Sequence, residues 1–342
     1  MTGINPFPLY IDRKNCSFAF AKVLSYLNAS YSVFSYAAKR YAAIPAIPPL
    51  PAAISVELSS RCNLACPECV TGTGLIKRKN SYISYDLASE IAAQSRGRAL
   101  SAWLSFQGEP MMHSDFFRIL ELFKGMNPVI STNGHFLDRE NCLRLARSPL
   151  RKIIISYDGA TPETYRMYRR GGDHTRVMEG IIRLAAAIRE NRSRLKMVLQ
   201  FLVHMGNEHE ISVADGFARS VGAGFRVKSM QVLDPDRAGE WMPSDHRLAR
   251  YACGEDGIPV NGPARKRGCF RMWTSAVITT DGDVVPCCYD KNGLHTMGNL
   301  AGMSFSEIWR GKKYESFREK VMRDRKLVDI CSNCPEGRRM FF

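Results

Sequence analysis

In ISVELSSRCNLACPEC (residues 54–69), a run rich in β-branched residues leads directly into three closely spaced cysteines. Cys62, Cys66 and Cys69 have the spacing C-x3-C-x2-C. Three thiolates on one short loop suit a 4Fe-4S cluster whose fourth iron has no protein ligand. Zinc is the alternative, but zinc sites typically combine two C-x2-C pairs, so the asymmetric triplet favours the cluster.

Beyond this loop, short β-branched runs alternate with helical patterns, which is typical of βα units and a parallel sheet. The predicted strands are 54–60, 102–107, 128–133, 152–158, 196–204 and 225–230. The predicted helices lie near 84–96, 114–125, 138–147, 174–191 and 208–220. Six strands with right-handed crossovers predict an α/β fold, a partial (β/α)6 TIM-like barrel over residues 53–235. The cysteine loop would then lie at the rim where barrel enzymes carry out chemistry.

Residues 1–52 are expected to form an N-terminal extension, with a helix over 16–43 and a stiff proline-rich linker over 44–51. Lys22 and Asn28 interrupt the apolar run of that helix. The sequence therefore favours a helix packed on the main domain over a signal peptide or a membrane span. A helix that binds a partner or makes peripheral contact with a membrane is the second alternative.

The chain has 342 residues, of which 45% are apolar and 24% charged, as expected for a globular protein. The 48 Lys and Arg residues exceed the 33 Asp and Glu residues, but they are spread along the chain without an RNA-binding motif. We therefore expect no nucleic-acid partner, and the charge suits a solvated surface, an anionic membrane or an acidic protein partner. The odd number of cysteines, 11, argues against a secreted disulfide framework and indicates a reducing cytoplasm.

The C-x3-C-x2-C loop after the first strand resembles the radical S-adenosylmethionine (radical SAM) superfamily over about residues 53–235. The resemblance implies that SAM chelates the open iron and is cleaved reductively to a 5′-deoxyadenosyl radical, which abstracts hydrogen from a substrate. FQGEP (106–110) is similar to the GGEP motif of that family, which implies SAM binding by Gly108, Glu109 and Pro110. An ordinary turn between a strand and a helix is the alternative for this segment.

Two further segments extend the resemblance. ISYDGA (155–160) ends the fourth strand, where the family binds ribose, which implies roles for Ser156 and Asp158; a cap on the turn at Gly159 is the alternative for Asp158. Arg169 is a candidate for the SAM carboxylate, or it is merely solvated. The residue before the third cysteine is often aromatic in this family but is Glu68 here, so the adenine must pack elsewhere.

A second set of cysteines follows residue 264. Cys269 precedes AVITTDGDVVPCC, whose Asp-Gly pair suits a tight hairpin turn, and a helix with a capping box at Ser304 and Glu307 leads to CSNC at the end of the chain. This region, 265–342, resembles the SPASM and twitch auxiliary domains, with 236–264 as a connecting region. The resemblance implies one auxiliary 4Fe-4S cluster, and zinc is the alternative for four cysteines. The expected ligands are Cys269, Cys287 in preference to Cys288, Cys331 and Cys334.

A fully ligated auxiliary cluster could take the second electron of a two-electron oxidation. The resemblance therefore implies an oxidoreductase-like radical SAM enzyme that acts on a small polar metabolite, such as a sugar or aminocyclitol. A maturase of a ribosomally made peptide is the first alternative. A non-catalytic iron-sulfur or zinc protein that carries electrons or acts as a scaffold is the second. The enzyme would receive electrons from a flavodoxin- or ferredoxin-like donor, which a basic surface would help to dock.

For the substrate, strand alternation indicates which side chains face the lumen of the barrel. If the even-numbered residues of the fifth strand face the same side of the sheet as Ser156 on the fourth, Gln200 and His204 line the cavity. Arg226 and Lys228 of the sixth strand would join them, and inward-facing charges require a polar ligand. A register shift of one residue would instead turn these side chains outward.

Overall fold

The computed structural model describes residues 18–42, 46–233, 237–253, 259–261, 266–332 and 334. Cys16, the start of the expected linker and residues 335–342 lie outside these ranges.

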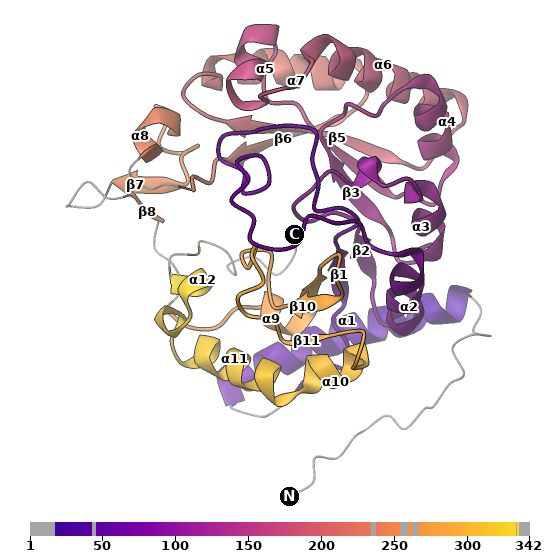
Figure 1. The fold of residues 1–342 in the computed structure, drawn as a ribbon, viewed down its shortest axis with the longest axis vertical. Helices are drawn as coiled ribbons and strands as arrows, with labels where there is room; N and C mark the ends of the chain where they lie inside the picture. The colour runs from indigo at the N-terminus through magenta and orange to yellow at the C-terminus, as the bar shows by residue number, and fades with distance from the viewer. Residues whose placement is uncertain are drawn as a thin grey trace, which may run out of the picture.

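Six parallel strands form the curved sheet of the barrel, in the chain order that the sequence predicts (Figure 1). They are β1 (Ala53–Val56), β2 (Ser101–Trp103), β3 (Val129–Thr132), β4 (Lys152–Ser156), β5 (Lys196–Val203) and β6 (Gly224–Ser229). Each strand pairs in parallel with the next. The predicted partial barrel is therefore confirmed.

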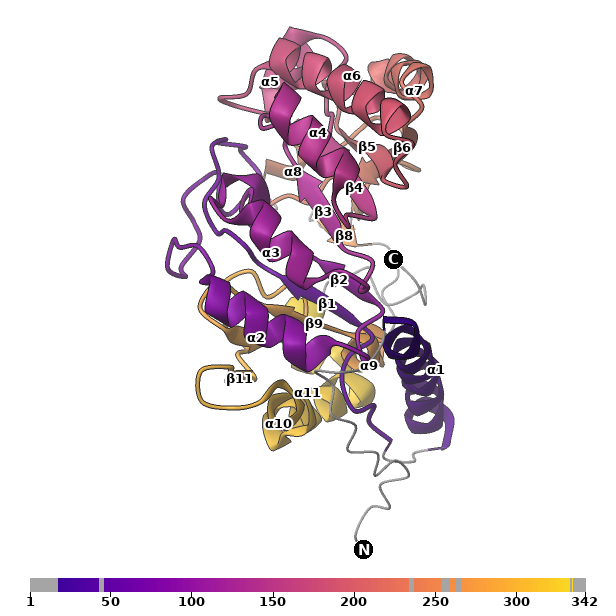
Figure 2. The ribbon, with the colours of Figure 1, turned by 90° about the vertical axis from the view of Figure 1, so that its right-hand side faces the viewer.

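Helices cover the outer side of this sheet (Figures 1 and 2). They are α2 (Tyr85–Ser95), α3 (Phe116–Leu122), α4 (Arg139–Arg147), α5 (Pro162–Tyr168), α6 (His174–Glu190) and α7 (Ile211–Ser220). The sequence analysis missed α5, a seven-residue helix that Thr161 and Thr164 begin with a capping box. The segment predicted as one helix over 208–220 begins with a 3-10 turn, Glu208–Glu210, before α7.

The two faces of β5 show how the sheet divides the core. Met197, Leu199, Phe201 and Val203 belong to the large cluster between sheet and helices. Leu202, on the other face, belongs to a smaller cluster that contains Cys66. Odd-numbered residues of β5 therefore face the helices, and even-numbered residues face the lumen.

The C-terminal region continues the sheet at its β1 edge. β9 (Ser275–Ile278) pairs in parallel with β1, β10 (Asp283–Val285) pairs antiparallel with β9, and β11 (Gly298–Asn299) completes a nine-stranded sheet. The predicted hairpin with its turn at Gly282 is present. The parallel pairing of β9 with β1 was not predicted, because no local feature of either strand indicates its neighbour.

Short helices follow the hairpin: α10 (Phe305–Arg310), α11 (Lys312–Arg323) and α12 (Asp329–Ser332), with a 3-10 turn at Arg325–Leu327. The predicted capping box of Ser304 and Glu307 is confirmed. The single helix expected after it is wrong, because the chain breaks at Gly311 between α10 and α11. Between barrel and hairpin lie α8 (Ala238–Trp241), the two-stranded sheet of β7 (Tyr251–Cys253) and β8 (Pro259–Asn261), and α9 (Arg271–Thr274).

The N-terminal helix α1 (Phe18–Ala42) lies along the outside of the molecule, against α9 (Figure 2). Tyr36 packs edge-to-face on Phe270 and Trp273, with ring centroids 5.3 and 5.5 Å away. Asn28 donates hydrogen bonds to backbone oxygens of Leu50 and Arg98. The expected packing of this helix on the main body is therefore present. Within the described ranges, no helix is both long and apolar enough to cross a membrane.

Candidate active site

The first cysteine loop follows β1 and curls tightly around Cys66. Cys66 is buried, whereas Cys62 and Cys69 are half-buried. A Cβ on Gly72 would lie 2.6 Å from Cys66 N and 2.7 Å from Cys66 O, so only glycine allows the chain to return this close. The sequence analysis missed this role of Gly72, although the Gly-rich run TGTG that contains it was a signal for such a turn.

The charges of Cys66 and Cys69 raise the pKa of Cys62, and the charge of Cys69 raises the pKa of Cys66, so the three side chains lie near one another. The pKa of Cys62 is raised to about 11, mainly by burial and also by the charges of Glu109, Cys66 and Cys69, while a hydrogen bond from the Leu64 backbone opposes the rise. Burial also raises the pKa of Cys66, while the charge of Arg169 lowers it. Thiolates in such a loop need a cationic partner, and the irons of a cluster would provide it.

Gly108 seats the FQGEP segment against the start of the cysteine loop. A Cβ here would lie 2.2 Å from Ser59 O and 2.5 Å from Arg61 O, so no other residue fits without moving backbone. The next backbone N–H, of Glu109, donates to Arg61 O at 2.8 Å. Pro110 then begins a 3-10 turn, Pro110–Met112.

Glu109 is buried, and its carboxylate connects the ends of β2 and β3. Oε1 accepts hydrogen bonds from Thr132 Oγ1 (2.8 Å) and Met111 N (3.1 Å), and Oε2 accepts one from Asn133 N (2.7 Å). Burial raises the pKa of Glu109, these hydrogen bonds oppose the rise, and the net pKa is about 7. A carboxylate offers about four acceptor positions. One therefore remains for an ammonium group, and the SAM-binding role of Glu109 stays a prediction.

Asp158 is fully buried at the end of β4 and pairs with Arg169. Its Oδ2 accepts from Arg169 Nε at 2.5 Å, and its Oδ1 accepts from Leu202 N at 2.7 Å. The carboxylate thus holds an ion pair and the end of β5 instead of capping the turn at Gly159. Arg169 also points Nη1 at Cys66 Sγ, 3.7 Å away. The predicted contact of Arg169 with SAM remains untested, but the arginine is not merely solvated.

The remaining expected lumen residues lie side by side across three strands. Ser156, Gln200 and Arg226 are register partners on β4, β5 and β6, and Lys228 pairs with Leu202. Ser156 is buried, Gln200 is half-buried, and Arg226 and Lys228 are exposed. Since Phe225 and Val227 pack on the helix side, the two cations face the lumen, in the predicted phase.

Lys228 lies among charged groups from several parts of the chain. Desolvation lowers its pKa, Asp158 raises it, and Arg250 and Arg169 lower it further. Lys291, after the second hairpin strand, shares this region, since desolvation lowers its pKa and the charges of Cys69 and Cys288 raise it. The lumen between the two cysteine sets is therefore lined by basic side chains.

His204 differs from the other expected lumen residues because it is almost fully buried. Its ring lies 5.5 Å from Trp241 and 6.2 Å from Tyr168, and its Nδ1 accepts from Gly206 N at 3.1 Å. Burial lowers its pKa. Within the described chain, His204 Nε2 and Trp241 Nε1 have no hydrogen-bond partner. Substrate contact by His204 remains a prediction and would require the cluster around Trp241 to open.

The second set of cysteines also converges. Burial and the charge of Cys334 raise the pKa of Cys269, and burial and the charge of Cys269 raise the pKa of Cys331. The pKa of Cys287 is raised first by a hydrogen bond with Cys288, then by burial and by the charges of Cys288 and Cys269. Cys288 is exposed and accepts a hydrogen bond from Arg271 Nη1 at 3.3 Å. The geometry therefore supports Cys287 as a ligand in preference to Cys288.

Arg325, which the sequence analysis missed, places a buried positive charge beside this second set of cysteines. It is buried, it donates from Nη2 to Cys334 O at 3.0 Å, and its charge lowers the pKa of Cys269 and Cys331. Across the described ranges, no three His, Cys, Asp or Glu side chains are placed to hold a single metal ion.

Glu68, which stands where the family often has an aromatic residue, makes a hydrogen bond to the backbone of a distant segment. It is buried, and its Oε2 accepts from Leu233 N at 2.6 Å, after the end of β6. The residue before the third cysteine therefore ties the cysteine loop to the far end of the barrel.

Two family models match the chain: residues 56–213 match the radical SAM superfamily, and residues 269–335 match the SPASM iron-sulfur cluster-binding domain. A similar relative is the S-adenosyl-L-methionine-dependent 2-deoxy-scyllo-inosamine dehydrogenase of Niallia circulans, 26% identical over 294 residues, which cover 82% of this chain and 91% of that enzyme. The PqqA peptide cyclase of Streptomyces rochei is 24% identical over 310 residues, which cover 84% of this chain and 82% of the cyclase.

Among solved structures, SuiB of Streptococcus suis bound to S-adenosylmethionine is similar, with a TM-score of 0.61 and 18% identity over 85% of this chain and 73% of SuiB. This likeness shows a shared fold.

Proposed function

Since the chain belongs to the radical SAM superfamily and is an enzyme with a C-terminal SPASM domain, we propose that it oxidises a small polar substrate by hydrogen abstraction. SAM and 4Fe-4S clusters are the cofactors of these domains, as the sequence predicts. When bound, they supply a 5′-deoxyadenosyl radical and a route for electrons.

One observation carries this proposal: each motif carboxylate is joined to a cysteine through a single bridging residue. Arg169 connects Asp158 to Cys66, with contacts of 2.5 and 3.7 Å. Asn133 donates its backbone N–H to Glu109 at 2.7 Å and reaches Cys62 Sγ with Nδ2 at 3.9 Å. The segments that the resemblance assigns to SAM therefore meet around the cysteine loop.

The residues of this site fit the cofactors they would hold. Cys62, Cys66 and Cys69 would ligate the first cluster and leave one iron for SAM. Donors at Cys62 and Cys66 stabilise charged sulfur and would tune the potential of that cluster. Glu109 would hold the methionyl ammonium in its remaining acceptor position.

The basic lumen supports a substrate with an anionic group. Arg226 and Lys228 face the lumen, and Lys228 and Lys291 share the neighbours Arg250 and Cys288, so the lumen favours an anionic group. A sugar or cyclitol that bears a carboxylate or phosphate would provide one, whereas a purely cationic aminocyclitol would not. The auxiliary cluster, held by Cys269, Cys287, Cys331 and Cys334, would accept the second electron of the oxidation.

Modification of a ribosomally made peptide is the second candidate. It is favoured by the similarity to a PqqA peptide cyclase over 84% of this chain. An acidic peptide segment would satisfy the same lumen cations. A flavodoxin- or ferredoxin-like donor in a reducing cytoplasm would supply electrons in either case.

Iron content and deuterium transfer test the proposal. Anaerobic reconstitution is expected to give about eight irons per chain, as two 4Fe-4S clusters require. The reduced protein is then incubated with SAM and deuterated panels of anionic sugars, anionic cyclitols and acidic peptides. Deuterium in 5′-deoxyadenosine with a member of the first two panels supports the proposal. Transfer only from peptides would establish the second candidate instead.

A further inference from the structure

Helix α1 is amphipathic in the wrong sense for an ordinary surface helix. Its buried side carries the polar residues Ser25, Asn28, Ser32 and Ser35, each at most 4% exposed. A surface helix of a globular protein usually buries its apolar side and exposes its polar one. Most of these polar groups have partners within the protein: each serine donates to the carbonyl oxygen four residues earlier, and Asn28 Nδ2 donates to Leu50 O and Arg98 O. Asn28 Oδ1 has no partner among the described residues.

The outer side of α1 carries large apolar residues. Five of them are between 53% and 83% exposed: Val23, Tyr26, Leu27, Phe34 and Tyr41. At 3.6 residues per turn they lie within an arc of roughly 100°, opposite the buried serines. These five residues share one side of α1, which we call the apolar stripe. A stripe of this size is costly in water and indicates contact with an apolar phase or partner.

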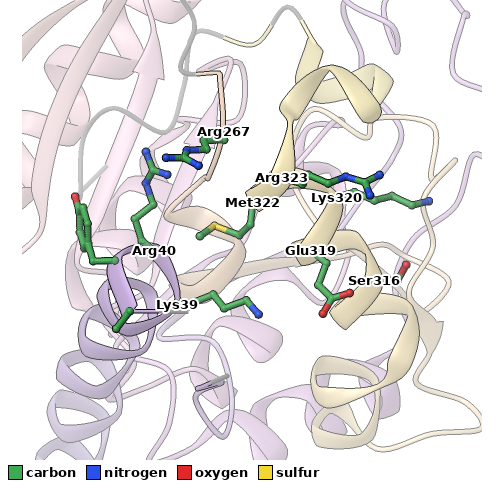
Figure 3. A pocket seen from close by; sticks show the side chains of 10 residues that line it. Lys39, Arg40, Arg267, Ser316, Glu319, Lys320, Met322 and Arg323 are labelled. Atoms are coloured by element: carbon green, nitrogen blue, oxygen red, sulfur yellow. The ribbon is translucent and has the colours of Figure 1, made fainter. Parts of the chain in front are cut away.

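The charge around the stripe is all of one sign. Helix α1 contains no acidic residue, and its charged residues are Lys22, Lys39 and Arg40. Its C-terminal end borders a cleft of 860 Å³ between α1 and α11 (Figure 3), which we call the basic cleft. Tyr41 lines this cleft and also ends the apolar stripe, so the two surfaces are continuous.

The basic cleft contains five cations and one carboxylate. The cations are Lys39 and Arg40 of α1, Arg267, and Lys320 and Arg323 of α11; the carboxylate is Glu319. A second cleft of 410 Å³ adds Lys312 and Lys313 on the other side of Lys320. The occupant of this region must therefore offer negative charge beside an apolar surface.

We propose that the apolar stripe and the basic cleft form a peripheral membrane-binding surface. Helix α1 lies in the plane of an anionic bilayer, with its stripe among the acyl chains and lipid phosphates in the basic cleft. An anionic membrane provides both features at once, an apolar layer and a dense layer of phosphates. A second copy of this chain would provide the apolar contact but would add its own cations, which repel.

Flotation with lipid vesicles tests this surface on the reconstituted full chain. The protein is expected to float with vesicles of phosphatidylcholine and phosphatidylglycerol, but not with phosphatidylcholine alone. Binding should weaken from 0.1 M to 1 M salt, as the Debye length falls from about 10 Å to about 3 Å. No flotation of the wild-type protein with the anionic vesicles would overturn the proposal.

Two double variants separate the parts of the surface. Leu27→Glu with Phe34→Glu is expected to weaken binding at least about tenfold. Lys320→Glu with Arg323→Glu should weaken it at least about 25-fold, since loss of each cation near an anionic surface removes about fivefold and the new carboxylates add repulsion. Val213→Glu is the matched control, because Val213 is 63% exposed on α7, outside this surface, and its variant should bind like the wild type.

All three variants should cleave SAM in solution at the wild-type rate. A failure of the membrane proposal can therefore be distinguished from a failure of the proposed function. Should the α1 variant lose helix content or iron, the cleft variant decides the outcome alone. Equal binding by the cleft variant and the wild type would overturn the proposal. So would a dimer in sedimentation velocity that the α1 variant abolishes, which would identify a second copy as the occupant.

Discussion

Replacement of Gly108 by alanine should disable the site while leaving its chemical groups intact. The added Cβ would lie 2.2 Å from Ser59 O, 2.5 Å from Arg61 O and 2.8 Å from Arg61 N, whereas ordinary contact begins at 3.4 Å. All three atoms belong to backbone, so the FQGEP segment must retreat from the cysteine loop by roughly 1 Å. Overpacking of this kind costs about 1–3 kcal/mol of folding free energy.

The retreat should also break the hydrogen bond from Glu109 N to Arg61 O and displace the Glu109 carboxylate. A misplacement of about 1 Å can cost a factor of about 100 in rate. We therefore expect Gly108→Ala to form 5′-deoxyadenosine about 100-fold more slowly and to unfold at lower urea concentration, with its iron content unchanged.

Gly216→Ala is the matched control for this change. Gly216 lies within α7, and a Cβ there would meet nothing within 4 Å. Alanine in a helix is favoured over glycine by about 0.5–1 kcal/mol, so this variant should be as active as the wild type and slightly more stable. A Gly108→Ala protein with wild-type stability and SAM cleavage would refute the reasoning.

Four further predictions follow from the site. Arg169→Lys keeps the charge but cannot reach both Asp158 and Cys66, so urea unfolding should show a loss of about 2 kcal/mol; an unchanged midpoint would contradict this. Cys287→Ser should lower the iron count from about eight to about four and leave SAM cleavage intact, whereas Cys288→Ser should keep all the iron; the reverse pattern would reassign the ligand. Burial raises the pKa of Glu109 from 4.5 to about 7, so the folded apoprotein holds a proton that the unfolded chain releases, and stability from this group falls by about 3 kcal/mol between pH 4.5 and 7. Glu109→Gln should remove that slope in urea unfolding measured against pH, and a difference between the two proteins that does not vary with pH would exclude the raised pKa. Lys228→Met should raise the KM of an anionic substrate without changing substrate-free SAM cleavage, and an unchanged KM would exclude Lys228 from binding.

The barrel and the cysteine loop could be predicted because their signals are local. Each strand from β1 to β6 is a short run of β-branched or aromatic residues, and the cysteines stand directly after the first run. The lumen-facing phase of Arg226 and Lys228 also follows from alternation along one strand. The hairpin at Gly282 and the capping box at Ser304 are equally local, and both are present.

Contacts between distant segments could not be predicted in this way. The pairing of β9 with β1 joins residues more than 200 positions apart, and neither run indicates its neighbour. The contact between Arg169 and Cys66 depends on how two loops meet at the barrel rim. The partners of Glu109 on β3 depend on the same packing, so its burial and raised pKa were also missed.

Formation of 5′-deoxyadenosine and methionine from SAM by the reduced, reconstituted protein tests the central claim most directly. The account predicts turnover by the wild type, no turnover by Cys66→Ala, and full turnover by Cys142→Ala, whose buried thiol contacts Gly180 O, away from both cysteine sets. Absence of 5′-deoxyadenosine from the wild-type protein with its iron in place, or its formation by Cys66→Ala at the wild-type rate, would contradict the account.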